Sequence, residues 1–423
     1  MELAAHGIIR LMSPTPPEHR GLGHVLTMFF VTTAIYLLPV MPLAAARTLP
    51  SSQTAVYSQL GGPRRRLPLT KFYDAPKPLP AGKPGELIRS EPADEYYLSG
   101  DFSAFRILYH SRSARGEDVA ASGVVLVPAG TPPPGGWPVI AWAHGFTGVA
   151  RQCAPSLLRS LHYGPFLSMY LDLGYAVVAT DYTGLGTDFR SAVLDVQSDA
   201  TDVIYAIPAA RGAVSQLGPK WVVMGPSLGA NVAVAVAEME SGIRDSNYLG
   251  SIAISGIADL KDIYVRRTTE KSFGMLEFVA YAVKTVYPDF NIRDLLTEKA
   301  RPGYQQIDES CSSLDSAAAF STGEMLKENW KANEFVDKFL NRNMLGQKPA
   351  YGPLLVISGG DDSEGLPAMT GQTVGRMCKQ GDRVQFNKFA ELQPGLVIGD
   401  SVRDQMAWID ARFAGRPAPG NCP

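Results

Sequence analysis

The chain has 423 residues, enough for two or three domains by length and ample for a large core. Its 39 basic and 41 acidic residues nearly cancel, and the longest basic run is 64–66, which argues against nucleic acid as a partner. The four cysteines form no Cys-x-x-Cys pair and the histidines do not cluster, so we expect no metal site; nothing in the sequence requires an organic cofactor.

The N-terminal segment has the features of a secretory leader. Residues 25–46 are almost wholly apolar, follow Arg10 and Arg20, and end in three alanines before Arg47. A basic, then apolar, then small-residue order is typical of a cleaved signal peptide. The apolar run also approaches membrane-spanning length, which leaves an uncleaved anchor as the alternative. We therefore predict a signal peptide over residues 1–46 and a mature protein that is secreted or held in the cell envelope.

An even number of cysteines fits an exported protein. Two disulfides are expected from four cysteines in an oxidising compartment. The sequence alone leaves all three connectivities open for the set Cys153, Cys311, Cys378 and Cys422.

The segment after the leader is rich in Pro, Gly and Ser, and we predict an irregular arm over residues 47–96. The main domain is expected over 97–423. It opens with two strand-like runs, 102–113 and 119–129, which flank a polar turn and predict a hairpin.

A continuous apolar run at 137–143 predicts a buried strand that ends at His144-Gly145-Phe146-Thr147-Gly148. A glycine-containing loop that leaves a central strand can point backbone N–H groups into a cleft, as an oxyanion hole requires. We predict the N–H of Phe146 as one donor, with Thr147 as second choice. His144 is expected to be a structural residue that shapes the loop.

Residues 174–180 predict another buried strand, and Asp181 after it is expected to accept hydrogen bonds from loop backbone. A helical stretch at 193–216 leads to a short apolar strand and the sequence Gly225-Pro226-Ser227-Leu228-Gly229. Strand, Gly-x-Ser-x-Gly and helix in this order predict a nucleophile elbow, with Ser227 as the nucleophile and the Leu228 N–H as the second oxyanion donor. The glycines are needed where strand and helix pack closely.

The alternation of strands and helices predicts a mostly parallel sheet. It continues with a strand at 249–255 and is interrupted at about 259–347 by aromatic and aliphatic residues at helical spacing. We predict a helical cap over the active site there; an ordinary packed helical layer is the alternative. A strand at 352–358 then leads to Asp361 and Asp362, and a strand at 384–389 precedes a closing helix at 404–413.

Five motifs in order resemble the secretory lipase family of α/β-hydrolases: HGFTG followed by CAPS, DYTGLG, GPSLG, LLVISGGDD, and DQMAWIDARFAGRPAP before Cys422. The resemblance covers about residues 97–423. It implies an α/β-hydrolase fold, with a mostly parallel sheet, helices on both faces and a helical cap that contacts a lipid interface. It also implies disulfides Cys153–Cys311 and Cys378–Cys422, and hydrolysis of acylglycerols or other carboxylic esters. Asp362 rather than Asp361 is implied as the triad acid.

One departure from the family is serious, because the triad order Ser, Asp, His places the base after the last strand. All six histidines lie at or before position 162, and Gln393 or Pro394 stands where the family has histidine. Neither side chain can take a proton from serine. A displaced His162 is one rescue; a surface or packing role for His162 is the alternative.

Three functional hypotheses follow. The first is a secreted serine ester hydrolase of lipase type with an incomplete triad, acting on lipids or small carboxylic esters. The second is a catalytically inactive member that binds lipid or ester ligands. Acyl transfer in the cell envelope is a third, and it also needs a base.

Overall fold

The computed structural model describes residues 66–192, 194–257, 259–266, 276–309, 311, 322–360, 365–393 and 395–422. All of them belong to one compact unit, Pro50–Pro423. The predicted leader and the acid candidates Asp361 and Asp362 lie outside the described residues.

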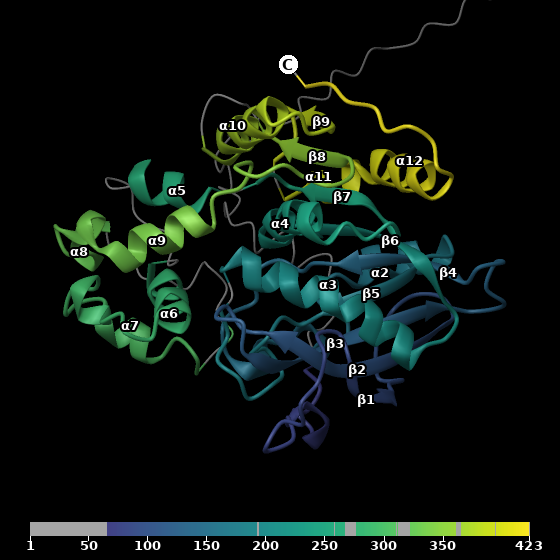
Figure 1. Ribbon diagram of the computed structural model, residues 1–423, viewed down its shortest axis with the longest axis horizontal. Helices are drawn as coiled ribbons and strands as arrows, with labels where there is room; N and C mark the ends of the chain where they lie inside the picture. Colours follow the sequence, from purple (N-terminus) through teal and green to yellow (C-terminus); the bar gives the residue numbers. More distant parts are fainter. Residues whose placement is uncertain are drawn as a thin grey trace, which may run out of the picture. The chain divides into compact units, whose positions relative to one another are not determined.

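A nine-stranded sheet forms the centre of the molecule (Figure 1), in the order β1-β2-β3-β5-β4-β6-β7-β8-β9. β1, β2 and β3 pair antiparallel, and β3 pairs antiparallel with β5; the six strands from β5 to β9 are parallel. The strands are β1 Leu87–Pro92, β2 Phe102–Arg112, β3 Asp118–Pro128, β4 Trp137–Trp142, β5 Ala176–Thr180, β6 Leu217–Pro226, β7 Tyr248–Ile254, β8 Leu354–Gly359 and β9 Val384–Phe389.

Helices cover both faces of this sheet, which is why its central strands are apolar on both sides. In β6, Val223 packs into the hydrophobic cluster that holds α3 Val196–Ala213, α4 Leu228–Ile243 and part of α10 Gly365–Lys379. Its neighbours Val222 and Met224 pack into the opposite cluster, with α2 Gly164–Asp172, α11 Val397–Asp400 and α12 Val402–Phe413. This three-layer arrangement with a mostly parallel sheet is the α/β-hydrolase fold.

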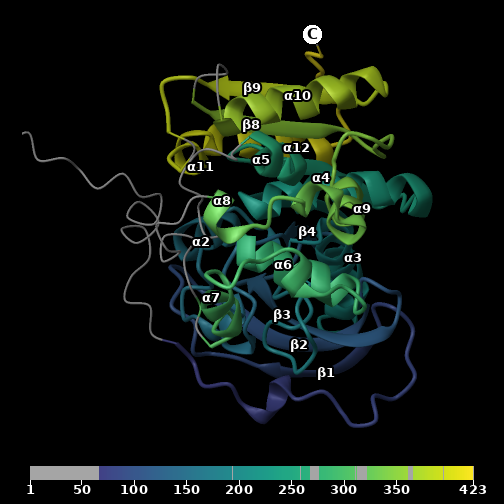
Figure 2. The same cartoon turned by 90° about the vertical axis from the view of Figure 1, so that its left-hand side faces the viewer.

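The predicted helical insertion is helical in its described parts. It contains α5 Leu260–Arg266, α6 Leu276–Val286, α7 Arg301–Gln305, α8 Thr322–Met325 and α9 Glu334–Arg342, which gather on one side of the sheet (Figures 1 and 2). An ion pair whose carboxylate is fully buried joins the last of them to the body, since Arg342 Nε lies 2.7 Å from Asp195 Oδ1 next to α3. None of the described helices is long and apolar enough to cross a membrane.

The predicted irregular arm needs a correction. Its last part contains β1, an edge strand that pairs with β2 from Leu87 opposite Tyr109 to Pro92 opposite Phe105, with one register shift. The sequence of β1, LIRSEP, carries little apolar alternation because the strand lies at the sheet edge and is stabilised mainly by backbone pairing. That pairing leaves no local hydrophobic signal.

Both disulfides implied by the family resemblance are present, Cys153–Cys311 and Cys378–Cys422. The second joins α10 to the C-terminal tail, which runs along the outer edge of β9. There the Asn421 side chain accepts a hydrogen bond from the Phe386 N–H at 2.6 Å and donates one to the Phe386 carbonyl at 2.9 Å. An amide side chain thus pairs with the strand as a neighbouring backbone would.

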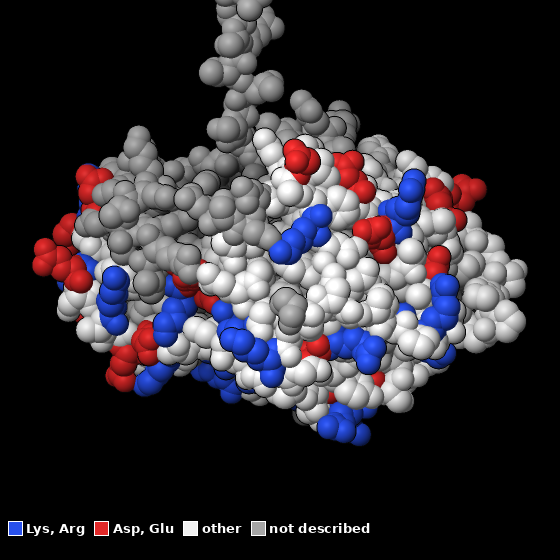
Figure 3. Space-filling model, turned by 90° about the horizontal axis from the view of Figure 1, so that it is seen from above, with Lys and Arg blue, Asp and Glu red and all other residues white. Residues whose placement is uncertain are grey.

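The molecular surface seen from above in Figure 3 shows basic and acidic side chains interspersed, with no large patch of one sign on that face. This distribution agrees with the near balance of charges in the sequence.

Candidate active site

Ser227 occupies the turn between β6 and α4 with φ 56° and ψ −121°. A non-glycine residue with this backbone geometry is strained and persists only where its surroundings impose it. The Ser227 N–H donates to the Ile254 carbonyl at 3.1 Å, which anchors the turn to β7. The side chain is exposed, and within the described part of the chain its hydroxyl has no hydrogen-bond partner. A serine held in a strained turn with its hydroxyl presented outward has the geometry of a nucleophile elbow.

One backbone atom leaves no room for a side chain at either glycine of the elbow. A Cβ at Gly225 would lie 2.1 Å from the Ala143 carbonyl oxygen, and one at Gly229 would lie 2.0 Å from the same atom. Ala143 follows β4, so the turn and the first turn of α4 both press against the end of the neighbouring strand. Any side chain at either position would force strand and helix apart.

The predicted oxyanion loop passes beside the serine. A Cβ at Gly145 would lie 3.6 Å from Ser227 Cβ. In the described structure neither the Phe146 N–H nor the Leu228 N–H has a hydrogen-bond acceptor. The Phe146 ring packs edge-on against Phe278 of α6 at 4.7 Å, so the helical insertion contacts this loop. The assignment of these two N–H groups to an oxyanion hole stays a prediction.

Two side-chain hydroxyl groups lie at this loop, and neither was assigned a role from the sequence. Thr147 Oγ1 is buried and has no hydrogen-bond partner among the described residues. The Tyr163 hydroxyl lies 2.6 Å from the position of a Gly145 Cβ, and its ring packs edge-on against Trp142. Tyr163 precedes α2 and is distant in sequence from both the loop and the serine, so no local pattern could indicate its place.

His144 is a structural residue, as predicted. It is buried, its Nδ1 lies 2.6 Å from the Gly145 carbonyl oxygen and its Nε2 lies 3.1 Å from the Asp181 carbonyl oxygen. Its ring stacks on Tyr182 with centroids 4.1 Å apart. Burial lowers the pKa of His144 to about 4, so it is neutral at physiological pH. A neutral imidazole has one N–H, so the ring donates to one of these two carbonyl oxygens.

Asp181 also has the structural role expected of it. Its carboxylate accepts hydrogen bonds from the Ser156 N–H at 2.8 Å, from the Ser156 hydroxyl at 2.5 Å and from the Ser122 hydroxyl at 2.7 Å. Burial raises the pKa of Asp181 to about 6, against the effect of these hydrogen bonds. The group fixes the loops that follow β4 and β5.

The loop after β9, where the sequence analysis expects the family's histidine, contacts the end of β8. A Cβ at Gly359, the last residue of β8, would lie 2.8 Å from the Leu392 carbonyl oxygen and 3.2 Å from that of Gln393. The loop after β9 therefore reaches the carboxyl end of β8. Gln393 is exposed there, and its amide cannot act as a base; Pro394 lies outside the described residues.

Three histidines fall within the described residues. His110 on β2 lies 3.0 Å from Asp118 Oδ1 through its Nδ1, and its ring fills the space beside Gly82. His144 is occupied as above. His162 immediately precedes Tyr163, is half-buried and has φ 68°, in the left-handed region. Among described residues no group of His, Cys, Asp and Glu side chains is arranged to hold a metal ion.

With this geometry in view, comparison with known proteins identifies the family. The sequence model of the secretory lipase family matches residues 164–421, more than half of the chain. The protein belongs to the secretory lipase family. No curated protein gives a significant match to the sequence.

Solved structures with the same fold include Candida antarctica lipase A in its closed state, with a TM-score of 0.71 and 17% identity over 84% of this chain and 88% of that one. The rice cell wall degrading esterase LipA from Xanthomonas oryzae matches with a TM-score of 0.64 and 18% identity, over 78% of this chain and 98% of that one. A putative hydrolase from Legionella pneumophila matches with a TM-score of 0.64 and 16% identity, over 79% of this chain and 100% of that one. At these identities the likeness concerns the fold.

Proposed function

We propose that the protein is an exported serine ester hydrolase of lipase type, in which Ser227 attacks the acyl carbonyl of a lipid or small carboxylic ester. The observation that carries this proposal is the strained, exposed serine at the elbow. The N–H groups of Phe146 and Leu228 would stabilise the oxyanion of the tetrahedral intermediate. Asp362 would orient and balance the charge of the base. Family membership, the two disulfides and the leader-like N-terminus support export.

The identity of the base is the open part of this mechanism. The loss of rate expected without a base decides how the function is tested. Removing the histidine of a serine triad costs about 10⁶ in kcat in the well-studied protease case and leaves roughly 10³ to 10⁴ over water. A serine without a base is a weak nucleophile. An active enzyme therefore needs another proton acceptor near Ser227.

We propose His162 as that acceptor. Helix α2 connects the parallel strands β4 and β5 and runs in the opposite direction to them. Its N-terminus therefore lies at the carboxyl edge of the sheet, where the elbow also lies. Leu161 and Tyr163 belong to the same hydrophobic cluster as Val397 and Ile398, which follow the loop with Gln393. His162 would thus approach the serine from the same face as the family's histidine.

Two further observations support this role for His162. The Tyr163 hydroxyl is adjacent to Gly145 and so close to Ser227. The backbone is left-handed at both Leu161 (φ 50°) and His162 (φ 68°). Non-glycine residues in this region cost of order 1–3 kcal/mol each and cluster at functional sites.

The second candidate function is a lipase-fold protein that binds a lipid or ester without turning it over. The observation that favours it is the exposed Gln393 in place of histidine, together with the absence of any histidine after position 162 in the sequence. This protein would keep the pocket and the elbow but not the proton transfer.

The test compares hydrolysis of short- and long-chain p-nitrophenyl esters by the chain from Arg47 onward with its disulfides formed. We expect Ser227→Ala to abolish turnover and labelling by a phosphonate ester, and His162→Ala to reduce kcat by a factor of at least about 10³. His110→Asn is the matched control, because it replaces a histidine on β2 that is paired with Asp118. It should keep its activity.

The outcomes separate the two candidate functions. Equal background rates for the unmodified protein and Ser227→Ala would rule out the hydrolase and support the binding protein. In that case Gln393→His should create activity, because it restores the family's base at its usual place. Full activity in His162→Ala would instead place the base elsewhere and leave the role of Ser227 intact.

A further inference from the structure

A cavity lies away from the serine, between the hydrolase body and the helical insertion. Its volume is about 330 Å³, within the usual range of small-molecule sites. Four segments line it: the turn between β2 and β3, the loop after β5, the start of α3 and the C-terminal end of α6 with the residues that follow (Figure 1).

The charged residues of this cavity are unbalanced. Four cations line it, Arg112, Arg115, Arg190 and Lys284, against one carboxylate, Glu117. Arg115 is paired with Glu117 at 2.7 Å, and Arg112 is paired with Asp118. Among the described residues, the other two cations donate only to neutral oxygens. Arg190 Nε donates to Thr285 Oγ1 at 2.8 Å, and Lys284 Nζ donates to the carbonyls of Pro288 and Phe290.

Arg190 keeps much of its donor capacity. Its guanidinium lies over the Tyr281 ring, 3.9 Å from the centroid, and makes one further long contact with the Tyr304 hydroxyl at 3.5 Å. A guanidinium has five N–H donors in a planar fork that matches a carboxylate. Since hydrogen bonds to described residues use two of these donors, the remaining three are sufficient for a bidentate contact.

The uncharged part of the cavity lining combines apolar and hydroxyl side chains. The apolar residues are Ala114, Val119, Phe189, Ala192 and Pro288, and the hydroxyl residues are Ser113, Thr183, Ser198 and Thr285. A ligand with one negative head group and an apolar body would contact the cations and the apolar residues together.

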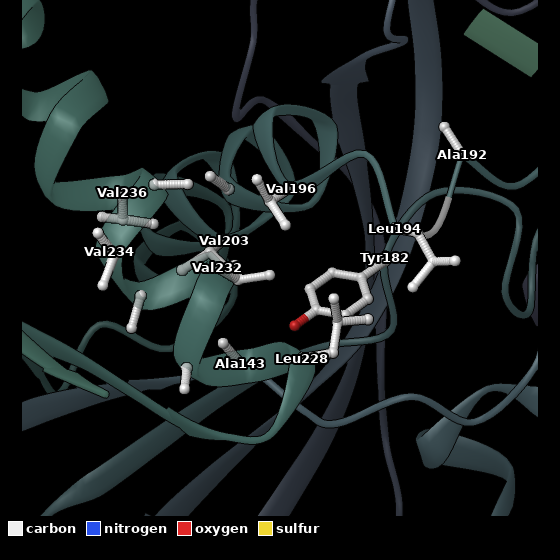
Figure 4. Packing of buried hydrophobic residues seen from close by; sticks show 14 of the residues in the cluster. Ala143, Tyr182, Ala192, Leu194, Val196, Val203, Leu228, Val232, Val234 and Val236 are labelled. Carbon is white, nitrogen blue, oxygen red and sulfur yellow. The ribbon is translucent and has the colours of Figure 1, made fainter. Parts of the chain in front are cut away.

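We propose that this cavity binds the carboxylate of an aliphatic amphiphile of the fatty-acid class, with Arg190 as the bidentate partner and Lys284 as the second cation. The site is separate from the nucleophile, because neither the elbow nor residues 144–148 contribute to the cavity lining. Figure 4 shows Ala192, Leu194, Tyr182 and Leu228 as members of one hydrophobic cluster. Carboxylates of this class are the acid products of ester hydrolysis, and in this respect alone the assignment rests on the proposed function.

Binding is tested by calorimetric titration of the Ser227→Ala protein with decanoate, so that the result does not depend on turnover. We expect saturable binding of decanoate at one site that weakens as salt is raised. Decanol, with the same chain and no charge, should bind at least about tenfold more weakly. Decyl phosphate distinguishes a general anion site from a carboxylate site; binding tighter than that of decanoate would overturn the assignment to carboxylates.

The variants separate charge from geometry. Arg190→Gln should weaken decanoate binding at least about tenfold, and Arg190→Lys should restore part of it, since a lysine keeps the charge but loses the fork. Arg115→Gln is the matched control: it lines the same cavity but is already paired with Glu117, so its effect should stay within about threefold. Lys284→Gln gives a second, independent loss if Arg190→Gln does not fold.

The proposal is overturned if decanol binds as tightly as decanoate, or if folded Arg190→Gln and Lys284→Gln both bind decanoate like the parent. Initial rates on a short p-nitrophenyl ester are measured with protein that keeps Ser227, and they report on the proposed function separately. Loss of hydrolysis with intact decanoate binding would reject only the enzyme, and the reverse would reject only the cavity.

Discussion

Gly229 sits where the start of α4 presses against the end of β4, and an alanine there meets two opposed effects. Alanine favours a helix by about 1 kcal/mol over glycine. Its Cβ would lie 2.0 Å from the Ala143 carbonyl oxygen, a backbone atom that cannot turn away. We expect the clash to dominate, and Gly229→Ala to lower the free energy of unfolding by about 2 kcal/mol or more.

The matched control is Gly375→Ala in α10, where an added Cβ meets no atom within 4 Å. It should raise the free energy of unfolding by about 0.5–1 kcal/mol through helix propensity alone. Urea unfolding of both variants measures the difference. Similar stabilities for the two variants would show that the turn can relax and that the elbow glycines are not required for packing.

Glu240 predicts a pH dependence of stability at the residue scale. It is fully buried in α4, one carboxylate oxygen accepts the Asp245 N–H at 3.0 Å, and the other has no partner among the described residues. Burial raises the pKa of Glu240 from 4.5 to about 7. Between these values the folded chain holds the proton and the unfolded chain releases it. Stability from this group is therefore present below pH 4.5 and is lost as the pH rises to 7.

Glu240→Gln tests this dependence, because glutamine keeps the shape and does not titrate. The parent should lose on the order of 2–3 kcal/mol more than the variant between pH 4.5 and 7.5, measured by urea unfolding at the two pH values. Glu328→Gln, which replaces an exposed carboxylate, should follow the parent. A parallel loss in the parent and in Glu240→Gln would mean that the buried carboxyl is not the source.

At the scale of single elements, α9 carries two ion pairs that should contribute differently to the free energy of unfolding. Arg342 contacts Asp195 through both carboxylate oxygens, at 2.7 and 3.0 Å, and the Asp195 side chain is fully buried. Lys338 and Glu334 pair one turn apart with their side chains 57% and 68% exposed. Breaking a buried pair leaves an uncompensated charge, whereas an exposed pair contributes little.

Arg342→Ala should therefore lower the free energy of unfolding by about 3–5 kcal/mol, and Lys338→Ala by no more than about 0.5 kcal/mol. Unfolding in urea with tryptophan fluorescence measures both changes. Equal effects of the two substitutions would indicate that α9 detaches before the body unfolds and that the Asp195 contact does not stabilise the whole unit.

The elements that the sequence predicts well are those buried on both faces. The runs that became β4, β5, β6, β7 and β8 are continuously apolar because helices cover both sides. The edge strand β9 is an exception to this rule, since it was predicted with its observed bounds although it is only partly buried. β1 was missed because an edge strand such as Leu87–Pro92 needs only backbone pairing. The helical insertion was predicted as helical from its spacing.

At the scale of the whole molecule, the parts of the site differ in how far they could be predicted. Ser227 is contained in a five-residue pattern, so the sequence indicates it directly. The approach of Tyr163 to Gly145, and the meeting of Arg190 with α6, depend on how distant segments pack. Such proximity leaves no local pattern and emerges only once the sheet order is known.

The tail that ends at Cys422 has a practical consequence. An uncovered edge strand is a template for pairing with another chain, and β9 would be such an edge without Asn421. The Cys378–Cys422 bond holds that cover in place covalently. Production in a reducing cytosol would release it and favour intermolecular aggregates, so an oxidising expression compartment and an affinity tag placed away from the C-terminus are the appropriate choices.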